Sequence, residues 1–208
     1  MIQFTLREFG PRVLRSALSA WAITTCDDGS MNDRRNEPPP GEPDNRDWTV
    51  VVDEGCEECG YKPHDPRTTA HRLEDGVPRW QEVLARPDAT RRPSLRVWSP
   101  VEYASHSSDL VRVLGERVTA MIASDDPEFA DYDGEAEAIR QQFWRAAPEE
   151  VGRQLQSRTR RTREILSRVG EEDWARTGHR GDGKVFTVAG LCRFLLHDVE
   201  HHLHDVDG

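Results

Sequence analysis

The stretch WSPVEYASH, residues 98–106, marks the start of a long helix and decides how the rest of the chain is divided. Ser99 and Glu102 have the spacing of a capping box, and Pro100 occupies the first helical position. From there, apolar residues recur at intervals of three and four, which predicts an amphipathic helix over residues 99–123. Its buried face is predicted to carry Tyr103, His106, Leu110, Val113, Leu114, Val118, Met121 and Ile122.

Three further long segments have the same helical periodicity. Pro78 lies inside the first of these segments, residues 69–85, and predicts either a kink or a later helix start. Four long helices joined by loops predict an all-α fold, a four-helix bundle over residues 68–208. The three segments cover residues 69–85, 148–169 (bounded by Pro148 and Gly170) and 187–203 (capped by Thr187), with a short helix predicted at 135–145.

The composition of the 208 residues argues against several classes of protein. No apolar run approaches the roughly 20 residues that a membrane-spanning helix needs, so no membrane association is predicted. The formal net charge of -10 argues against a nucleic-acid partner, because such binding needs a basic surface. The four cysteines include one close pair, Cys56 and Cys59, which is no disulfide framework and favours a reducing, cytoplasmic location.

The chain before the bundle divides into two parts. Residues 1–47 are predicted to be a disordered leader or, over the first 30 residues, a translated extension rather than a signal peptide. Residues 48–67 begin with the β-branched run WTVVV, which predicts a short strand. That strand leads into a knuckle, the sequence CEECG at residues 56–60. The leader is therefore expected to carry a CxxC knuckle outside the bundle.

Three interpretations of the pair Cys56 and Cys59 are open. In the first, His64 and His71 complete a second, four-ligand metal site, although the spacing is not that of a standard zinc finger. In the second, the two thiols form a reversible disulfide. In the third, the leader folds over the bundle and places the thiols near a metal bound by the histidines.

Four of the eight histidines lie in the last twelve residues. His197 and His201 are four residues apart and share a helix face, to which His204 also belongs. A rotation of about 100° per residue turns His202 toward solvent. His106, on the apolar stripe of the second long helix, is the outstanding candidate for a third metal ligand, because a buried imidazole needs a partner. The alternative to a metal site is that His106 is a core histidine with hydrogen-bonded ring nitrogens and that the C-terminal histidines are solvated.

Two motifs resemble those of the DinB-like superfamily, namely WSPxEYxxH at residues 98–106 and HDxxHH at residues 197–202. The resemblance covers about residues 68–206. This resemblance implies a metal-binding four-helix bundle whose three ligands are His106, His197 and His201. His204 lies on the same helix face and is a candidate for an additional ligand. The superfamily includes mycothiol- and bacillithiol-dependent transferases and mycothiol-dependent maleylpyruvate isomerases.

Three imidazoles leave coordination positions open, which is typical of a catalytic metal. Zinc is the expected ion, with nickel or iron as alternatives. A cation stabilises the thiolate form of a thiol, so a thiol S-transferase or a thiol-dependent isomerase is expected, with mycothiol as co-substrate. The alternatives are a metal-dependent hydrolase and a non-catalytic metal-binding or stress-response protein.

Further expectations concern the surroundings of the metal. Glu102 lies one turn before His106 and is a candidate to hydrogen-bond a ligand imidazole, while its alternative role is to close the capping box. Asp198 and Asp205 are candidates to orient ring nitrogens, or else they are solvated. The partners expected are a small-molecule thiol and an electrophile. A homodimer is compatible with such a bundle.

Overall fold

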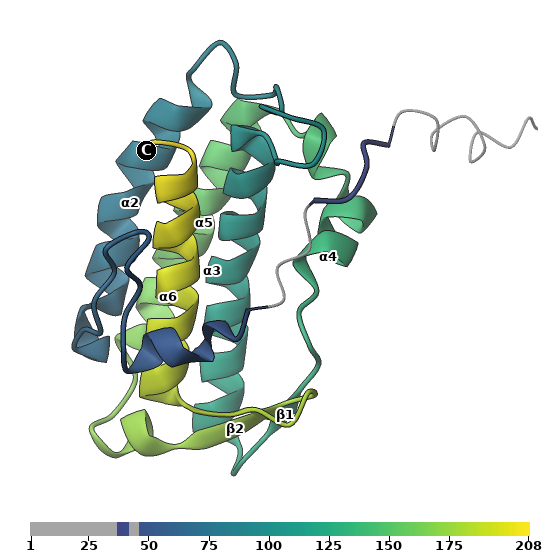
Figure 1. Ribbon diagram of the computed structural model, residues 1–208. Helices are drawn as coiled ribbons and strands as arrows, with labels where there is room; N and C mark the ends of the chain where they lie inside the picture. Colours follow the sequence, from purple (N-terminus) through teal and green to yellow (C-terminus); the bar gives the residue numbers. More distant parts are fainter. Residues whose placement is uncertain (1–36, 42–45) are drawn as a thin grey trace, which may run out of the picture. The chain divides into compact units, whose positions relative to one another are not determined.

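The computed structural model describes residues 37–41 and 46–208, and a helical bundle makes up most of this part (Figure 1). The predicted all-α four-helix bundle is confirmed, with helix boundaries close to those expected. Among the described residues, no helix combines the length and the apolar character that a membrane crossing requires. The four long helices are α2 (Thr69–Leu84), α3 (Pro100–Ala123), α5 (Pro148–Leu166) and α6 (Val188–Asp205).

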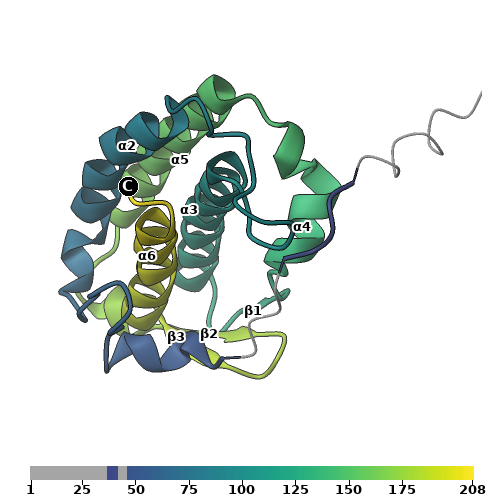
Figure 2. The same cartoon turned by 45° about the horizontal axis from the view of Figure 1, so that its top comes forward.

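Helices α5 and α6 each pack against both α2 and α3 (Figure 2). The two helices that follow each other in the sequence, α2 and α3, therefore occupy diagonal positions in the bundle. Removing one large apolar side chain from water contributes about 1.5–3 kcal/mol, so the shared interior stabilises this arrangement. The buried core includes Leu73 and Trp80 of α2, Leu110, Leu114 and Met121 of α3, Leu155 of α5, and Leu191, Leu196 and Leu203 of α6.

The starts of the helices follow from local sequence. Glu102 accepts hydrogen bonds from the backbone N–H and the hydroxyl of Ser99, at 2.8 and 2.6 Å, within the predicted capping box. At the start of α6, the hydroxyl of Thr187 accepts a hydrogen bond from the N–H of Gly190 at 2.9 Å. Helix α2 continues through Pro78, because the apolar residues on both sides of it are buried in the core.

Outside the bundle lie a short helix, α4 (Gly134–Gln141), and a three-stranded sheet. The short helix agrees with the prediction at 135–145, whereas the sheet was predicted as loops. Strands of two to four residues are too short to show an alternating pattern. Strand β1 (Glu128–Phe129) is parallel to β2 (Thr177–Arg180), and β2 is antiparallel to β3 (Val185–Thr187).

Short 3-10 helices also lie between the longer elements, namely η3 (Pro66–Thr68), η4 (Phe143–Arg145) and η5 (Glu172–Ala175).

The segment Trp48–Val52 is a 3-10 helix, η2, and the predicted strand at this position is wrong. Asp47 caps the helix and accepts hydrogen bonds from the N–H and the hydroxyl of Thr49, at 3.1 and 2.6 Å. Val51 is buried in a small apolar cluster with Tyr61, beside α6. β-branched residues favour strands where a neighbouring strand can pair with them, and this segment packs on a helix instead.

Most of the predicted leader, residues 1–36 and 42–45, lies outside the described residues. The short piece 37–41 contacts the bundle. The carbonyl of Pro39 accepts a hydrogen bond from Arg92 at 2.7 Å, and the N–H of Gly41 donates to the carboxylate of Glu135 at 3.0 Å.

Candidate metal centres

Helix α6 carries two overlapping pairs of candidate ligands at i and i+4 spacing: His197 with His201, and Asp198 with His202. Residues four apart share a helix face, and successive residues are rotated by about 100°. The two pairs therefore face different neighbours. The first pair meets the CxxC loop (residues 55–61), and the second meets α3.

The first group of ligands, here called the open group, consists of His106 from α3 with Asp198 and His202 from α6. One ligand atom from each residue lies within 4.8 Å of the others. The ring centroids of His106 and His202 are 5.0 Å apart, and only 18% of the His202 side chain is exposed. The prediction that His202 faces solvent is wrong, because α3 packs on the side of α6 toward which this residue is rotated.

Both imidazoles of the open group use Nδ1 for a partner outside the group. Nδ1 of His202 lies 3.0 Å from Oδ2 of Asp205, and Nδ1 of His106 lies 3.3 Å from the hydroxyl of Tyr132. Hydrogen bonds of this kind fix the orientation of a ligand ring and leave its other nitrogen for an ion. Consistent with this, Nε2 of His202 lies 3.5 Å from Oδ1 of Asp198 within the group.

The protonation of the two rings suits a cation. Burial, together with the nearby His202, holds the pKa of His106 well below its ordinary value, so this ring is neutral at neutral pH. Burial opposes protonation of His202 as well, but the hydrogen bond with Asp205 and the charges of Asp198 and Asp205 raise its pKa overall. Two imidazoles and a carboxylate fit a divalent ion, and the carboxylates of Asp198 and Asp205 that raise the pKa of His202 favour a positive charge at this place.

Tyr132 and Asp109 support the open group, and neither was predicted from the sequence. The hydroxyl of Tyr132 donates to Oδ2 of Asp109 at 3.3 Å, beside its contact with His106. Asp109 is fully buried and accepts a hydrogen bond from Arg158 at 2.9 Å. The available signal was the spacing of three between His106 and Asp109, which places both on one face of α3. Tyr132 lies in a loop, where no periodicity marks it.

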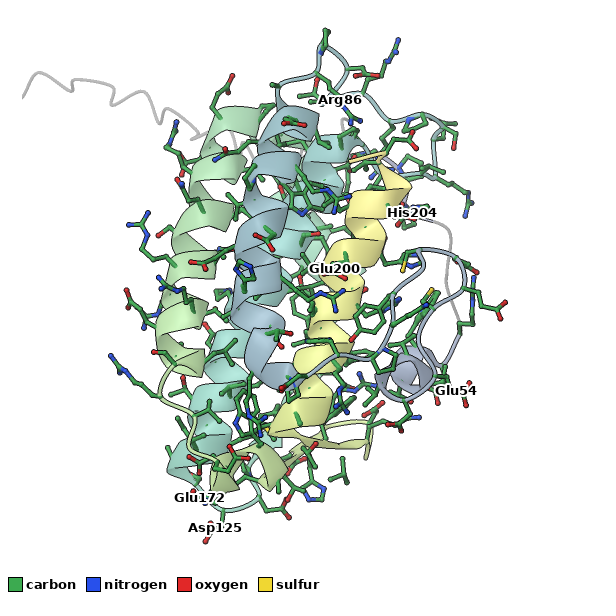
Figure 3. The ribbon with its side chains drawn as sticks, turned by 90° about the vertical axis from the view of Figure 1, so that its left-hand side faces the viewer. Glu54, Arg86, Asp125, Glu172, Glu200 and His204 are labelled. Carbon is green, nitrogen blue, oxygen red and sulfur yellow. The ribbon has the colours of Figure 1, made fainter. Side chains whose placement is uncertain are left out.

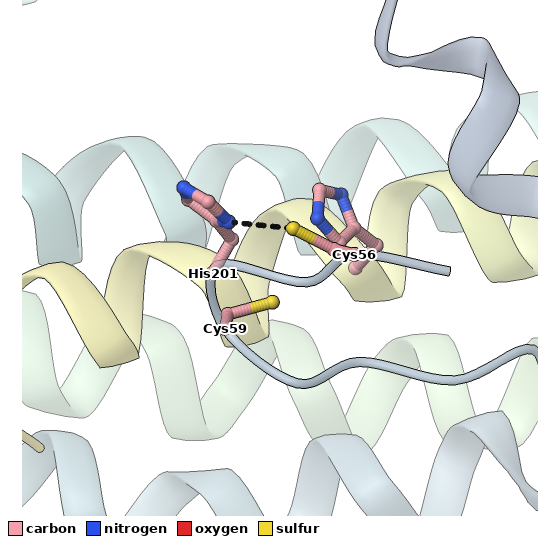
Figure 4. A group of neighbouring side chains, drawn as sticks. Cys56, Cys59 and His201 are labelled. Atoms are coloured by element: carbon pink, nitrogen blue, oxygen red, sulfur yellow. Dashed lines mark hydrogen bonds between the residues drawn. The ribbon is translucent and has the colours of Figure 1, made fainter. Parts of the chain in front are cut away.

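The second group of ligands, here called the closed group, consists of Cys56, Cys59, His197 and His201. Their four ligand atoms all lie within 4.8 Å of one another, and Sγ of Cys56 is 3.6 Å from Nδ1 of His201. Figure 4 shows the side chains of Cys56, Cys59 and His201 directed toward one another. Of the three interpretations of the cysteine pair, the folding of the leader over the bundle agrees with this geometry.

The predicted ligand set of His106, His197 and His201 is thus divided between the two groups. Among the described residues, the two groups share no member. The candidate additional ligand, His204, is exposed near the C-terminal end of α6 and belongs to neither group (Figure 3).

Glu102 does not support a metal ligand in the way proposed from the sequence. Its carboxylate accepts hydrogen bonds from Ser99 and from the guanidinium of Arg92, the latter at 2.5 Å. Both partners lie at the start of α3 or in the loop before it, so Glu102 has the capping role that was its alternative.

His64 and His71, the other candidates for a site with the cysteines, lie outside the closed group. The ring of His64 bridges the hydroxyls of Tyr61 and Thr69, at 3.0 and 2.8 Å. Burial and nearby arginine charges lower the pKa of His64 to about 4. The side chain of His71 is 77% exposed, and its Nε2 lies 3.5 Å from the carboxylate of Asp75.

A cavity of about 500 Å³ lies against both groups. Trp48 forms part of its wall and packs on the closed group, with its ring centroid 5.4 Å from that of His197 and 5.1 Å from that of His201. On the other side, the ring of Trp98 packs on His106 at 5.4 Å. Arg96, Tyr103 and Glu135 also line the cavity.

A family model described as the DinB superfamily matches residues 84–206, which is more than half of the chain. The chain belongs to the DinB superfamily. The resemblance of the two histidine motifs to this superfamily is therefore confirmed.

Among solved structures, this DinB superfamily chain is similar to YfiT from Bacillus subtilis, with a TM-score of 0.60 and 17% sequence identity. The match covers 71% of this chain and 91% of YfiT, which is described as a probable metal-dependent hydrolase with an unusual four-helix bundle topology. No curated protein matches the sequence. The segment that matches the DinB superfamily contains the whole open group, whereas Cys56 and Cys59 of the closed group precede it.

Proposed function

We propose that this member of the DinB superfamily is a metal-dependent enzyme that uses a small-molecule thiol of the mycothiol type. Its ion is held by His106, Asp198 and His202. The observation that carries the proposal is a group of three donors in the wall of a cavity of about 500 Å³. Three protein ligands leave positions open to a substrate, which is typical of a catalytic site. The reaction is thiol transfer to an electrophile, or a thiol-dependent isomerisation.

The chemistry divides between the ion and the residues around it. A divalent ion at these donors supplies Lewis acidity, which lowers the pKa of an entering thiol or water. Asp205 and Tyr132 hold the two imidazoles in place through Nδ1. Trp48 and Trp98 line the cavity with aromatic rings.

Glu135 is the candidate acceptor for the proton that the thiol loses. Its carboxylate lines the cavity and belongs to neither ligand group. The indole N–H of Trp98 and the backbone N–H of Gly41 donate to it, at 3.2 and 3.0 Å. Both donors are neutral and hold the carboxylate in position beside the cavity.

Zinc is the ion that we expect, because two imidazoles and one carboxylate form a familiar catalytic zinc site. Nickel and iron accept the same donors and are tested beside it.

Hydrolysis is the second candidate function, and the likeness to YfiT favours it, since that protein is described as a probable metal-dependent hydrolase. The same three donors would then activate water instead of a thiol. The two functions differ in whether product formation requires a thiol.

The test uses the full-length chain without a histidine tag, loaded with zinc, nickel or iron. We expect metal-dependent conjugation of mycothiol to a bimane electrophile, followed by fluorescence. His106→Gln and His202→Gln should each lower the rate by about 100-fold or more, because each removes a ligand of the ion. His204→Gln is the matched control, since this exposed histidine lies on the same helix and in neither group.

Three outcomes would change the conclusion. A conjugation rate that is equal without metal, or unchanged in His202→Gln, contradicts the proposal. Thiol-independent cleavage of ester or amide substrates that is lost in the same variants replaces thiol chemistry by hydrolysis. Binding of the ion without either activity indicates a non-catalytic metal-binding protein.

A further inference from the structure

We propose that Cys56, Cys59, His197 and His201 bind one zinc ion in a closed tetrahedral site that fastens the CxxC loop to α6. The site goes beyond the proposed enzymatic function and does not depend on it. Two thiolates and two imidazoles are one of the standard donor sets of structural zinc sites. With four protein ligands, no coordination position remains for a substrate.

The distances within the group suit zinc. A tetrahedral ion with Zn–S bonds of about 2.3 Å and Zn–N bonds of about 2.0 Å separates its sulfur and nitrogen ligands by about 3.5 Å. Sγ of Cys56 and Nδ1 of His201 are 3.6 Å apart. The remaining ligand atoms all lie within 4.8 Å of one another, so small side-chain rotations complete the tetrahedron.

The burial and charge of the group also favour a cation. His197 is only 2% exposed, and its Nε2 has no hydrogen-bond partner among the described residues. Buried polar atoms in native proteins are nearly always paired, and a metal ion is a partner that an imidazole nitrogen accepts. Two thiolates neutralise a Zn²⁺ ion, which removes the cost of burying an isolated charge.

The CxxC loop presents its two thiols from a backbone shape that the sequence enforces. Gly55 and Gly60 have positive φ angles of +83° and +74°, which favour glycine. A Cβ on Gly55 would lie 2.6 Å from the carbonyl oxygen of Tyr61, which accepts a hydrogen bond from the N–H of Cys56 at 2.9 Å. Gly55 therefore allows the close backbone approach that closes the loop.

The loop is attached to α6 by contacts that are independent of any ion. The hydroxyl of Tyr61 donates to the carbonyl of Arg193 at 3.1 Å, and its ring lies 5.2 Å from the ring of His197. On the far side of the group, Nε2 of His201 lies 3.6 Å from Oδ1 of Asp205 and 3.9 Å from Oε2 of Glu58. Nε2 therefore faces the two carboxylates, while Nδ1 faces Sγ of Cys56.

The site also positions part of the cavity wall. Helix η2 directly precedes the CxxC loop, and its Trp48 packs on both histidines of the closed group. An ion that joins the loop to these histidines therefore holds Trp48 against the cavity.

The experiment is a cobalt titration of the reduced, full-length, untagged protein after bound metal has been removed with a chelator. We expect a thiolate-to-cobalt charge-transfer band in the ultraviolet and the visible bands of tetrahedral cobalt, both displaced by zinc. Cys56→Ser and Cys59→Ser should each lower the intensity of the thiolate band by about half and weaken zinc binding by about 100-fold, and the double variant should remove the band. His201→Gln should remove the tetrahedral visible bands.

Three control variants must keep the thiolate band. Cys192→Ala removes a buried thiol of the core, and His204→Gln removes an exposed histidine of α6, neither of which belongs to the group. His106→Gln disables the open group, so a band that persists there separates this site from the proposed enzymatic function.

Circular dichroism checks that each variant is folded. If Cys56→Ser does not fold, Cys59→Ser carries the test, because Cys59 is partly exposed. Absence of the thiolate band in the wild type, its persistence at full intensity in Cys59→Ser, or a Cys56–Cys59 disulfide that resists reduction would each overturn the proposal.

Discussion

The open and closed groups use the same turn of α6 but differ in their donors and in the elements that supply them. The open group joins α6 to α3 through two imidazoles and one carboxylate, and both elements are helices of the bundle. The closed group joins α6 to the CxxC loop through two imidazoles and two thiols. The difference in ligand number, three against four, separates a site that can bind a substrate from one that holds two segments together.

The two groups are also connected. The carboxylate of Asp205 reaches both, with Oδ2 at 3.0 Å from Nδ1 of His202 and Oδ1 at 3.6 Å from Nε2 of His201. A single residue therefore hydrogen-bonds to one ring of the open group and lies beside one ring of the closed group. This shared contact provides the most direct way to test whether the two sites act separately.

The largest effect is expected from Asp205→Asn, which keeps the size of the side chain and removes its charge. Loss of a carboxylate that orients a ligand imidazole weakens metal binding by about 10- to 100-fold. We expect zinc affinity to fall at both sites, measured by competition with a chromophoric chelator. Asp207→Asn is the control, because Asp207 is exposed and has a positive φ angle that asparagine tolerates. Weakening at one site only would show that Asp205 is not shared in function.

The next effect concerns the open group alone. A Cβ on Gly134, the first residue of α4, would lie 2.7 Å from Cε1 and 3.1 Å from Nδ1 of His106. Gly134→Ala should therefore displace the His106 ring and weaken metal binding at the open group by about tenfold, in line with an overpacking cost of about 1–3 kcal/mol. The thiolate band of the closed group should be unchanged.

The matched control for that variant is Gly76→Ala. Gly76 lies in α2, and a Cβ added there would meet no atom within 4 Å, so alanine should stabilise the helix by about 1 kcal/mol. If Gly134→Ala affected both metal sites equally, the distinction between the two groups would fail.

A smaller effect is expected from Tyr132→Phe. The variant removes the hydroxyl that lies 3.3 Å from both His106 and Asp109. One hydrogen bond contributes about 1 kcal/mol, so metal affinity at the open group should fall about fivefold. Isothermal titration of the metal-free protein measures this change. An unchanged affinity would show that His106 needs no support at Nδ1.

The smallest effect is a change in pH dependence. The pKa of His64 is lowered to about 4, from an ordinary value of 6.5, by burial and then by the charges of Arg72 and Arg193. The unfolded chain therefore takes up a proton at His64 near pH 6.5, which the folded chain takes up only near pH 4. The contribution of His64 to the free energy of unfolding is fully present above pH 6.5 and is lost as the pH falls from 6.5 to about 4.

Urea unfolding of the metal-free protein between pH 7 and pH 4 measures that loss. His64→Gln should make the dependence on pH shallower and should leave the thiolate band of cobalt intact. His71→Gln, at an exposed position, is the comparison. Loss of the band in His64→Gln would instead place His64 among the ligands of the closed group.

Local sequence predicted most of the fold. The capping box of Ser99 and Glu102 marked the start of α3, and Thr187 marked that of α6, since caps act within one turn. The run at 48–52 was predicted as a strand, because its β-branched residues carry no information about which element packs against them.

The candidate ligands were predicted less completely than the fold. His106, His197 and His201 were recognised as ligand candidates, and Cys56 and Cys59 as a pair. His202 was expected to face solvent, and Asp198 was expected at most to orient a ring. Both lie in the open group, because the position of α3 beside α6 depends on contacts between helices that are distant in the chain.

The sequence by itself determined which residues share a face of each helix, because a helical repeat of 3.6 residues fixes directions around one axis. It also determined the donor types that are available, from the imidazoles of α6 to the thiols of the CxxC loop. Only the tertiary structure decided which donors meet. The directions around one helix say nothing about what lies opposite, and the packing of α3 and of the CxxC loop on α6 sorts seven candidate ligands into a group of three and a group of four.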